Sequence, residues 1–385
     1  MSEFRTIREL CSVVVDCPHS TPKWTANGKI VIRNNNIKHG RIDFSSPSYT
    51  DDEHFAQRIK RAKPQPGDII ITREAPIGDV GMIPENTECC LGQRMVLLRA
   101  NQSVCDNFYL LYSLQSLYVQ HQISWSEGTG TTVSNLRIPH LEQIQIPYLP
   151  LEQQAKISSV LRALEEKIEN NRRLNDNLQQ QAMSLYAEMF LNSSDSNVTS
   201  GTLSDIAVIT MGQSPSGSSY NEDGVGEVFY QGRAEFGFRF PKRRLFTTEP
   251  KRMAEAGDVL LSVRAPVGDL NIAYERCCIG RGLGAIHSKT DHSSFVLYTM
   301  FALRSQLDVF NGEGTVFGSI NRDALNAIPI DIPPVTEIDQ FEVVAHPIDE
   351  LIRANYEENC RLEAIRDSLL PKLMSGEIDV SAVQL

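Results

Sequence analysis

GDIIITREAPIGD (Gly67–Asp79) and GDVLLSVRAPVGD (Gly257–Asp269) are nearly the same phrase, written twice in one chain. Each begins with a Gly-Asp turn, continues through an apolar run typical of a buried strand, and ends in a loop with a proline and a glycine at fixed offsets. Two such copies predict a strand-turn-strand frame used in two separate domains, and favour a structural role over a direct chemical one. A chain of 385 residues is long enough for two domains with separate cores.

The similarity between the two halves extends on both sides of this phrase. TIRELC (Thr6–Cys11) parallels TLSDIA (Thr202–Ala207), and CCLGQR (Cys89–Arg94) parallels CCIGRG (Cys277–Gly282). In each half a glycine loop, EGTGTTVSNL or EGTVFGSINR, precedes a proline-containing strand and a long helix. Mixed strand and helix patterns in both halves predict an α+β fold built from a duplicated unit.

Both long helices carry a coiled-coil pattern. Positions recur at alternating steps of four and three residues from Ile157 to Met189, and again 184 residues later from Phe341 to Leu373. Each seam contains two asparagines: Asn171 and Asn175 in the first helix, Asn355 and Asn359 in the second. We predict that these amides fix the register of an antiparallel pair, and the alternative is that they lie where the seam meets solvent. Pro347 predicts a kink or a short preceding turn in the second helix.

The composition is that of an ordinary globular protein, with a net charge of −11. Residues 335–380 alone hold 11 acidic and 4 basic residues, whereas positive charge gathers in RIKRAK (Arg58–Lys63) and PKRR (Pro241–Arg244). Local patches of this kind decide which surface meets phosphate. The sequence has no long apolar run and no signal-peptide pattern, and its eight cysteines have no zinc spacing, so we expect a cytoplasmic protein with reduced thiols.

Motifs for catalysis are missing from the sequence. It has no phosphate-binding P-loop, no GxGxxG between a strand and a helix, and no Asn/Asp-Pro-Pro-aromatic stretch typical of amino-methyltransferases. Asp68 and Glu74 resemble a nuclease pair, but Arg264 stands where the second copy would need the glutamate. The histidines show no metal-ligand spacing. We therefore predict a non-catalytic chain without a metal or cofactor of its own.

Taken together, these features resemble the specificity subunit of type I restriction-modification systems. The resemblance covers essentially the whole chain. Its main parts are the lead IPYLPLEQQAKISSVLRALEEKIENNRRLNDNL into the first helix, the two Gly-Asp strands and the tail LLPKLMSGEIDV (Leu369–Val380). The second helix departs from the pattern, because Thr336, Glu337 and Ile338 stand where the first has Glu152, Gln153 and Gln154.

The resemblance implies a non-catalytic DNA-binding subunit. Each globular unit would be a target recognition domain that reads one half of a bipartite double-stranded DNA target. The long helices would form an antiparallel coiled coil that sets the spacer and docks methyltransferase subunits, with two copies expected, and restriction/translocase subunits would join them. S-adenosylmethionine, ATP and Mg would then belong to the partners. The competing interpretation is a two-domain coiled-coil adaptor that binds proteins and not DNA.

On this reading, the domain boundaries follow the repeat. They are 1–150 and 201–334 for the target recognition domains, 151–192 and 335–380 for the long helices, 193–200 for a linker and 381–385 for a tail.

DNA contacts require cations and hydroxyls for phosphates, and forked donors and acceptors for base edges. In the first unit the candidates are Arg33, Asn34, Asn35, Asn36, Lys38, Lys60, Arg61, Lys63, Arg73, Arg94, Thr129, Thr131 and Thr132. In the second they are Gln213, Ser214, Ser216, Tyr230, Gln231, Arg233, Arg239, Lys242, Arg243, Arg244, Arg264, Arg281 and Thr315. The three asparagines fit an adenine-reading loop or a simple turn, and the RIKRAK cations fit phosphate contacts or a solvated face. An internal pair of Arg94 with Glu74 is the alternative for that arginine.

Overall fold

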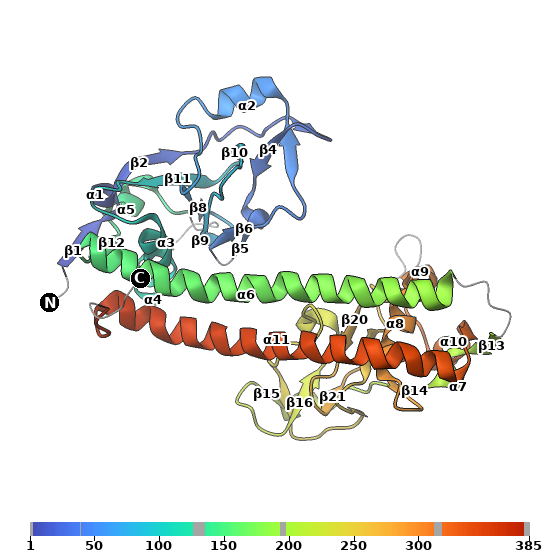
Figure 1. Cartoon of the computed structure of the whole chain (residues 1–385). Coiled ribbons are helices and arrows are strands. Elements are labelled where there is room, and N and C mark those ends of the chain that lie inside the picture. The colour runs from blue at the N-terminus through green and yellow to red at the C-terminus, as the bar shows by residue number, and fades with distance from the viewer. Residues whose placement is uncertain (1–2, 39, 126–134, 193–197, 312–317, 381–385) are drawn as a thin grey trace. The chain divides into compact units, whose positions relative to one another are not determined.

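The computed structural model describes residues 3–38, 40–125, 135–192, 198–311 and 318–380. The chain folds into two compact units, one made of Met1–Asn170 with Glu358–Leu385 and the other of Asn171–Glu357. Figure 1 labels many of the elements of both units. Each unit contains sheets, short helices and a part of each long helix, which confirms the α+β class predicted from the sequence.

The first unit is built on two four-stranded sheets. One is antiparallel, in the order β2 (Cys11–Asp16), β11 (Met95–Ala100), β8 (Ile69–Arg73) and β9 (Ile77–Met82). The other has the order β10 (Cys89–Leu91), β4 (Lys29–Ile32), β7 (Ser48–Thr50) and β3 (Trp24–Thr25), with β10 parallel to β4. Two-stranded sheets pair β1 (Glu3–Thr6) with β12 (Gln145–Tyr148) and β5 (Ile37–Lys38) with β6 (Arg41–Ile42). The short helices are α1 (Ile7–Leu10), α2 (Asp52–Arg58), α3 (Asn107–Gln115), α4 (Leu117–Ser124), α5 (Ile138–Gln143) and the 3₁₀ turn η1 (Asn34–Asn36).

The second unit repeats this plan. Its antiparallel sheet has the order β14 (Ala207–Met211), β22 (Leu283–Ser288), β19 (Val259–Ser262) and β20 (Leu270–Ile272). The five-stranded sheet has the order β15 (Tyr220–Asn221), β17 (Phe246–Thr247), β16 (Glu227–Tyr230), β21 (Cys277–Ile279) and β18 (Met253–Ala254). The strand β13 (Thr199–Thr202) pairs with β23 (Pro329–Ile332). The short helices are α7 (Leu203–Ile206), α8 (Ser293–Ala302), α9 (Arg304–Asp308) and α10 (Arg322–Asn326), with 3₁₀ turns η3 (Gly217–Ser219), η4 (Arg233–Glu235) and η5 (Val309–Asn311).

The repeated Gly-Asp phrase is the entry to the central strand of each antiparallel sheet. Gly67 and Gly257 have φ of 83° and 91°, a left-handed conformation that favours glycine. The Asp68 carboxylate accepts from the Gln65 amide at 2.8 Å, and Asp258 accepts from Glu255 at the same distance. Asp68 also pairs with Arg99, and Asp258 with His287, on the neighbouring strand. The phrase therefore has the structural role that the sequence favoured.

The long helices are part of both cores. The helix α6 (Leu151–Tyr186) has 36 residues and continues into a π-helical turn, η2 (Ala187–Leu191), and α11 (Val335–Ser375) has 41 residues. In the first unit, Ile157 of α6 and Leu373 of α11 pack in one core with Tyr109 of α3 and Ile69 of β8. The second unit has an equivalent core that contains the α6 residue Ala182, the α8 residue Phe295 and the α11 residue Phe341. In each unit, the segments of α6 and α11 therefore pack in the same core as the sheets and the short helices.

Within each unit the two helix segments run antiparallel, and the four asparagines are buried between them. In the second unit, Asn355 Nδ2 donates to Asn175 Oδ1 at 2.8 Å, and Asn175 Nδ2 donates to the Ile352 carbonyl at 3.3 Å. In the first, Asn359 Nδ2 donates to the Ile168 carbonyl at 3.3 Å. Asn171 is buried in the same seam. These amides satisfy one another and the backbone, which is the arrangement that a register-fixing role requires.

Of the two alternatives predicted at Pro347, a kink or a short preceding turn, the turn is wrong, because α11 is one helix through this position. The kink stays a prediction. Proline removes the hydrogen bond to the carbonyl four residues earlier. That carbonyl belongs to Val343, whose side chain is 75% exposed, and Pro347 is exposed as well. Water can solvate the freed group on this face, so the helix continues.

Candidate nucleic-acid interface

In the first unit, the ends of β2, β8 and β11 meet at a corner that is closed by ion pairs. Arg73 ends β8, and its guanidinium pairs with Asp16 at 2.9 Å. Its Nε also donates to the Leu136 carbonyl at 2.8 Å, and its Nη2 donates to Asn135 Oδ1 at 3.1 Å. The Arg73 side chain is only 10% exposed, so its guanidinium is engaged by partners inside the protein.

A second ion pair lies beside the first. Arg94 Nε is 3.1 Å from Glu74 Oε2, and Asn135 Nδ2 donates to the other Glu74 oxygen at 2.7 Å. The Glu74 carbonyl accepts from Asn34 Nδ2 at 2.7 Å. The sequence left open an internal partner for Arg94, and the structure provides Glu74. The corner of the first unit is therefore neutralised by its own acids.

The same corner exists in the second unit, where backbone hydrogen bonds match position to position. The Arg73 amide donates to the Arg94 carbonyl, and the Val263 amide donates to the Gly282 carbonyl. In the same way, Leu136 bonds to Arg73, and Ile320 bonds to Val263. The four charged residues of the first corner, Asp16, Arg73, Glu74 and Arg94, correspond to Met211, Val263, Arg264 and Gly282. The second unit therefore has the same backbone hydrogen bonds as the first but lacks its ion pairs.

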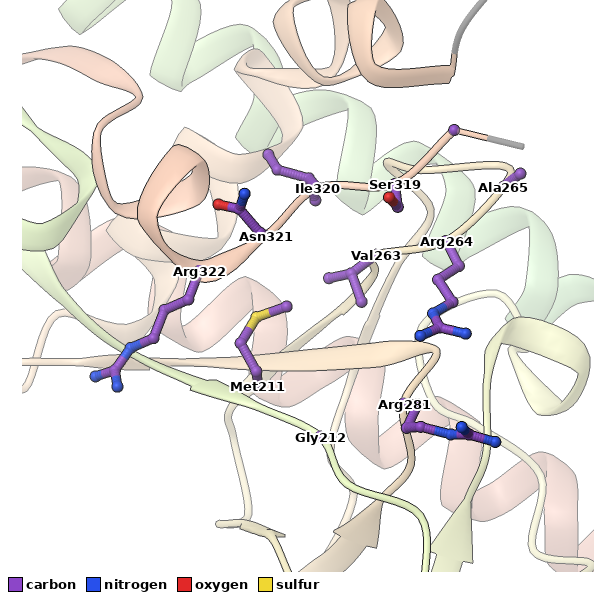
Figure 2. A pocket seen from close by; sticks show the side chains of 11 residues that line it. Met211, Gly212, Val263, Arg264, Ala265, Arg281, Ser319, Ile320, Asn321 and Arg322 are labelled. Carbon is purple, nitrogen blue, oxygen red and sulfur yellow. The ribbon is translucent and has the colours of Figure 1, made fainter. Parts of the chain in front are cut away.

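Without those ion pairs the second corner is a hollow of about 770 Å³. Figure 2 shows Arg264 and Arg281 on one side of it and Arg322 at the opposite end, across Met211. All three arginines are exposed, and among the described residues none of them has an acidic partner. The lining contains no carboxylate in the part of the chain that the structure describes. This is an electropositive concavity in a chain whose net charge is −11.

The RNNNIK segment divides into buried and exposed residues. Asn36 Oδ1 accepts from the Arg33 amide at 2.9 Å, and its Nδ2 donates to the Asp43 carbonyl at 3.0 Å, so Asn36 closes the turn. Asn35 and Arg33 are exposed, and the Arg33 guanidinium lies 5.2 Å from the centre of the Trp24 ring. Lys38 pairs with Asp43 at 2.6 Å. The segment therefore forms the turn that the sequence allowed, with Asn35 exposed on it.

The RIKRAK segment has one structural cation and three exposed ones. Arg58 is buried and donates to four backbone carbonyls, and its burial lowers the pKa of the guanidinium. Lys60 and Arg61 are exposed. Lys63 pairs with Glu88 at 2.9 Å, and Lys29 also reaches Glu88, so the two ammonium groups lower the pKa of this carboxyl to about 2.

Most polar candidates of the second unit lie at its surface. Gln213, Ser216, Gln231 and Lys242 are exposed, and Ser214 Oγ accepts from the Arg281 amide at 3.2 Å. Three further arginines are exposed but bound to acids: Arg233 to Asp269, Arg243 to Glu275, and Arg244 to Glu235 and Glu222. These three are partly neutralised, which sets them apart from the arginines of the hollow.

Four predicted contacts do not fit the structure, because their side chains are buried: Asn36, Arg73, Tyr230 and Arg239. Arg239 is 3% exposed and pairs with Asp349 of α11 at 3.2 Å, where burial raises the pKa of the Asp349 carboxyl. Tyr230 belongs to an apolar core on β16. A polar sequence context predicts a surface position for arginine and tyrosine, whereas tertiary packing covers Arg73, Tyr230 and Arg239. Thr129, Thr131, Thr132 and Thr315 lie outside the described residues.

The sequence prediction missed Arg322. It is the last residue of the quoted stretch EGTVFGSINR and the first residue of α10, and it lines the hollow with Arg264 and Arg281. Its place in that stretch is the only signal in the sequence, because the hydrogen bond that brings Ile320 to Val263 joins segments 57 residues apart.

No group of three metal-binding side chains occurs among the residues that the structure describes. Asp68 and Glu74, the pair weighed as a nuclease centre, are bound to Arg99 and Arg94. The Cys89–Cys90 and Cys277–Cys278 thiols are free and buried in β10 and β21, and burial raises the pKa of Cys89 and Cys277 to about 12. None of the helices in this described part of the chain has the length and apolar character needed to cross a bilayer.

Comparison with known proteins gives a consistent result. A family model described as the type I restriction modification DNA specificity domain matches residues 3–180 and again residues 195–359. A Methanocaldococcus jannaschii protein named for the specificity subunit of the type I restriction enzyme MjaX is 28% identical over 400 residues, covering 98% of this chain and 94% of that protein. The MjaIX type I restriction enzyme specificity subunit of the same organism is 24% identical over 346 residues, covering 82% and 78%.

A solved structure shares the fold. The crystal structure of a type I restriction-modification system S subunit from M. genitalium matches with a TM-score of 0.57 at 19% identity, covering 96% of this chain and 95% of that one. The family model covers most of the chain, and its two matches correspond to the two repeats, each with part of a long helix. The chain therefore belongs to the type I restriction-modification DNA specificity family.

Proposed function

We propose that this chain is the DNA sequence-recognition subunit of a type I restriction-modification complex, and that each unit reads one half of a bipartite target. The observation that carries the proposal is the duplication itself. Two units with the same strand order in their antiparallel sheets and the same Gly-Asp frame present different exposed polar residues, such as Asn35 in one and Gln231 in the other. A bipartite DNA site requires two recognition domains, and two copies of one fold with different surfaces can supply them.

Exchanging one unit tests this directly. Replacing residues 1–140 with the corresponding part of a relative should change one half of the methylated sequence and leave the other half as it was. Methylome sequencing of cells that carry the hybrid with its methyltransferase subunits gives both halves in one measurement. A hybrid that alters both halves together would contradict independent reading, and one that alters neither would place recognition elsewhere.

We further propose that α6 and α11 set the distance between the two half-sites and dock the methyltransferase subunits, of which two are expected. The proposed domain boundaries, 1–150, 151–192, 193–200, 201–334, 335–380 and 381–385, follow from this division of labour, although each compact unit also holds part of both helices. The division between the units falls between Asn170 and Asn171 on α6 and between Glu357 and Glu358 on α11. An insertion at these two points leaves the contacts within each unit unchanged.

Four residues inserted at both points would lengthen the pair by about 6 Å at about 1.5 Å per residue. Because a DNA duplex rises about 3.4 Å per base pair, we expect a spacer one or two base pairs longer with both half-sites unchanged. A matched control carries the insertion in α6 alone, which mispairs the seam. A fully active double insertion with its original spacer would rule out the spacer role.

The chain is the non-catalytic member of its complex, and we propose that it binds no cofactor itself. S-adenosylmethionine, ATP and Mg would be held by the methyltransferase and restriction/translocase subunits. Calorimetry of the purified chain with S-adenosylmethionine should give no binding heat, and the assembled methyltransferase should give one. Tight binding to the chain alone would contradict this assignment.

A further inference from the structure

The hollow of the second unit gathers positive charge from three separate segments. Arg264 follows β19, Arg281 precedes β22, and Arg322 begins α10. The floor between them is apolar, with Val263 and Ile320 buried. Low-dielectric walls around charges of one sign concentrate the electric field in a concavity. Such a place stabilises an anion more than any of the three arginines would alone.

Arginines that share a concavity without acids repel one another, so an external anion is the natural partner. The first unit shows the alternative solution at the same backbone positions, where Asp16 and Glu74 neutralise Arg73 and Arg94. The second unit has apolar or basic residues in place of both acids, namely Met211 and Arg264. The loss of both acids at one corner leaves a guanidinium surface with no internal counter-charge among the described residues.

Resting on the function proposed above, we propose that this hollow binds phosphates of the DNA backbone at the second half-site, and that the first unit has no equivalent phosphate site at its corner. Reading base edges requires an element that protrudes into a groove about 12 Å wide. Side chains that line a concavity are recessed, and they receive the convex sugar-phosphate backbone instead. Guanidinium groups bind phosphate oxygens in a forked geometry. Arg264, Arg281 and Arg322 therefore position the DNA and do not read its sequence.

The test uses the full chain assembled with its methyltransferase subunits, in the forms R264A, R281A and R322A. Affinity is measured for a duplex that carries the methylated target and for a random duplex, from about 50 to about 200 mM salt. Each lost phosphate contact should reduce the slope of log affinity against log salt by about 0.9 and weaken both duplexes by the same factor. The methylated sequence in cells should stay unchanged.

Two further variants make the result specific. R276A removes an exposed arginine of the same unit that is held by Glu227 and Glu255, so it changes the net charge equally and should leave the slope unchanged. R322K keeps the positive charge on which the salt slope depends and loses only the forked geometry of the guanidinium, so it should retain most of the wild-type slope.

Either of two results would overturn the proposal: alanine variants with an unchanged slope, or variants that relax the base preference of the second half-site. A wild-type complex whose affinity is indifferent to salt would instead refute the proposed DNA-binding function. The two failures are therefore distinguishable.

Discussion

The corners of the two units have matching backbone hydrogen bonds. They differ in whether acidic side chains of the same chain pair with their arginines. In the first unit, Arg73 and Arg94 are paired with Asp16 and Glu74 of the same chain. In the second, Arg264 and Arg281 face a hollow with no acid among the described lining residues. Duplication preserved the strand ends and their hydrogen bonds, because these hold the sheet together. The side chains at the corner differ between the units, with an internal ion-pair network in the first and an open cationic surface in the second.

A second difference reverses the charges around equivalent strands. Glu88 precedes the Cys-Cys pair of β10 and lies between Lys29 and Lys63. Arg276 precedes the Cys-Cys pair of β21 and lies near Glu227 and Glu255. The same three-charge arrangement is built with opposite signs. In both units, one charged side chain lies near two side chains of the opposite sign. Opposite charges at this place are therefore common to both units, whereas the sign of each residue is not.

The largest effect should come from breaking the buried pair in the first corner. R73A removes the guanidinium that pairs with Asp16 and donates to the Leu136 carbonyl, so Asp16 keeps only the exposed His19 beside it. Removing one member of a buried ion pair costs about 3–5 kcal/mol. The double variant D16M/R73V introduces the residues found at these positions in the second unit. It should lower the free energy of unfolding by less than R73A does. Denaturant unfolding followed by tryptophan fluorescence reports this unit selectively, because both tryptophans, Trp24 and Trp125, lie in it.

An unchanged unfolding free energy of R73A would show that the corner is not closed by this pair. A double variant as unstable as R73A would show that the two corners are not interchangeable frames.

A smaller effect separates two neighbouring asparagines in the first unit. N36A removes the amide that bonds to the Arg33 amide and the Asp43 carbonyl, and should cost about 1–3 kcal/mol of unfolding free energy. N35A removes an exposed side chain and should leave stability unchanged while weakening the first half-site, with a lost base contact equal to about 1–3 kcal/mol of binding. Unfolding curves and methylome sequencing of both variants make the comparison. Equal stability losses would contradict the division between buried and exposed asparagines.

Opening the first corner should make it resemble the second. E74Q keeps an oxygen that can accept from Asn135 but removes the charge that holds Arg94, so the freed guanidinium could meet phosphate. We expect the salt slope of DNA binding to become steeper by about 0.9. The control E74Q/R94A should return it to the wild-type value. A slope that stays the same in E74Q would mean that this corner lies away from the DNA backbone, unlike the corner proposed for the second unit.

The smallest effect concerns pH. The pKa of Glu88 is lowered to about 2, from an ordinary value near 4.5, by hydrogen bonds and charge from Lys29 and Lys63. A lowered carboxyl pKa stabilises the folded state at pH values above the ordinary one, and the stabilisation is lost as pH falls toward about 2. Wild type should therefore exceed E88Q in unfolding midpoint at pH 6, and the difference should shrink between about pH 4.5 and pH 2. A difference that is constant over this range would assign the effect to packing instead of charge.

Local sequence patterns determined the duplicated α+β architecture, the long helices and their asparagine seam. A Gly-Asp turn, an apolar strand and a four-three repeat each depend on neighbouring residues, so they can be recognised without a structure. The short turn considered before Pro347 does not form, since a rule about helix breaking does not include the solvent exposure of Val343, four residues earlier. The functions of individual polar residues could not be predicted in this way.

Tertiary structure alone decided which arginines are available to DNA. Arg73 and Arg264 follow the same strand one position apart in the repeated phrase, yet Arg73 is buried against Asp16, 57 residues away, and Arg264 is exposed beside Arg281 and Arg322. A charge meets its partner through contacts between segments that are distant in the chain, and its burial depends on the packing of several elements at once. The sequence by itself therefore determined that there are two units on one plan, whereas only the three-dimensional neighbours of each side chain decided that one corner is closed and the other open.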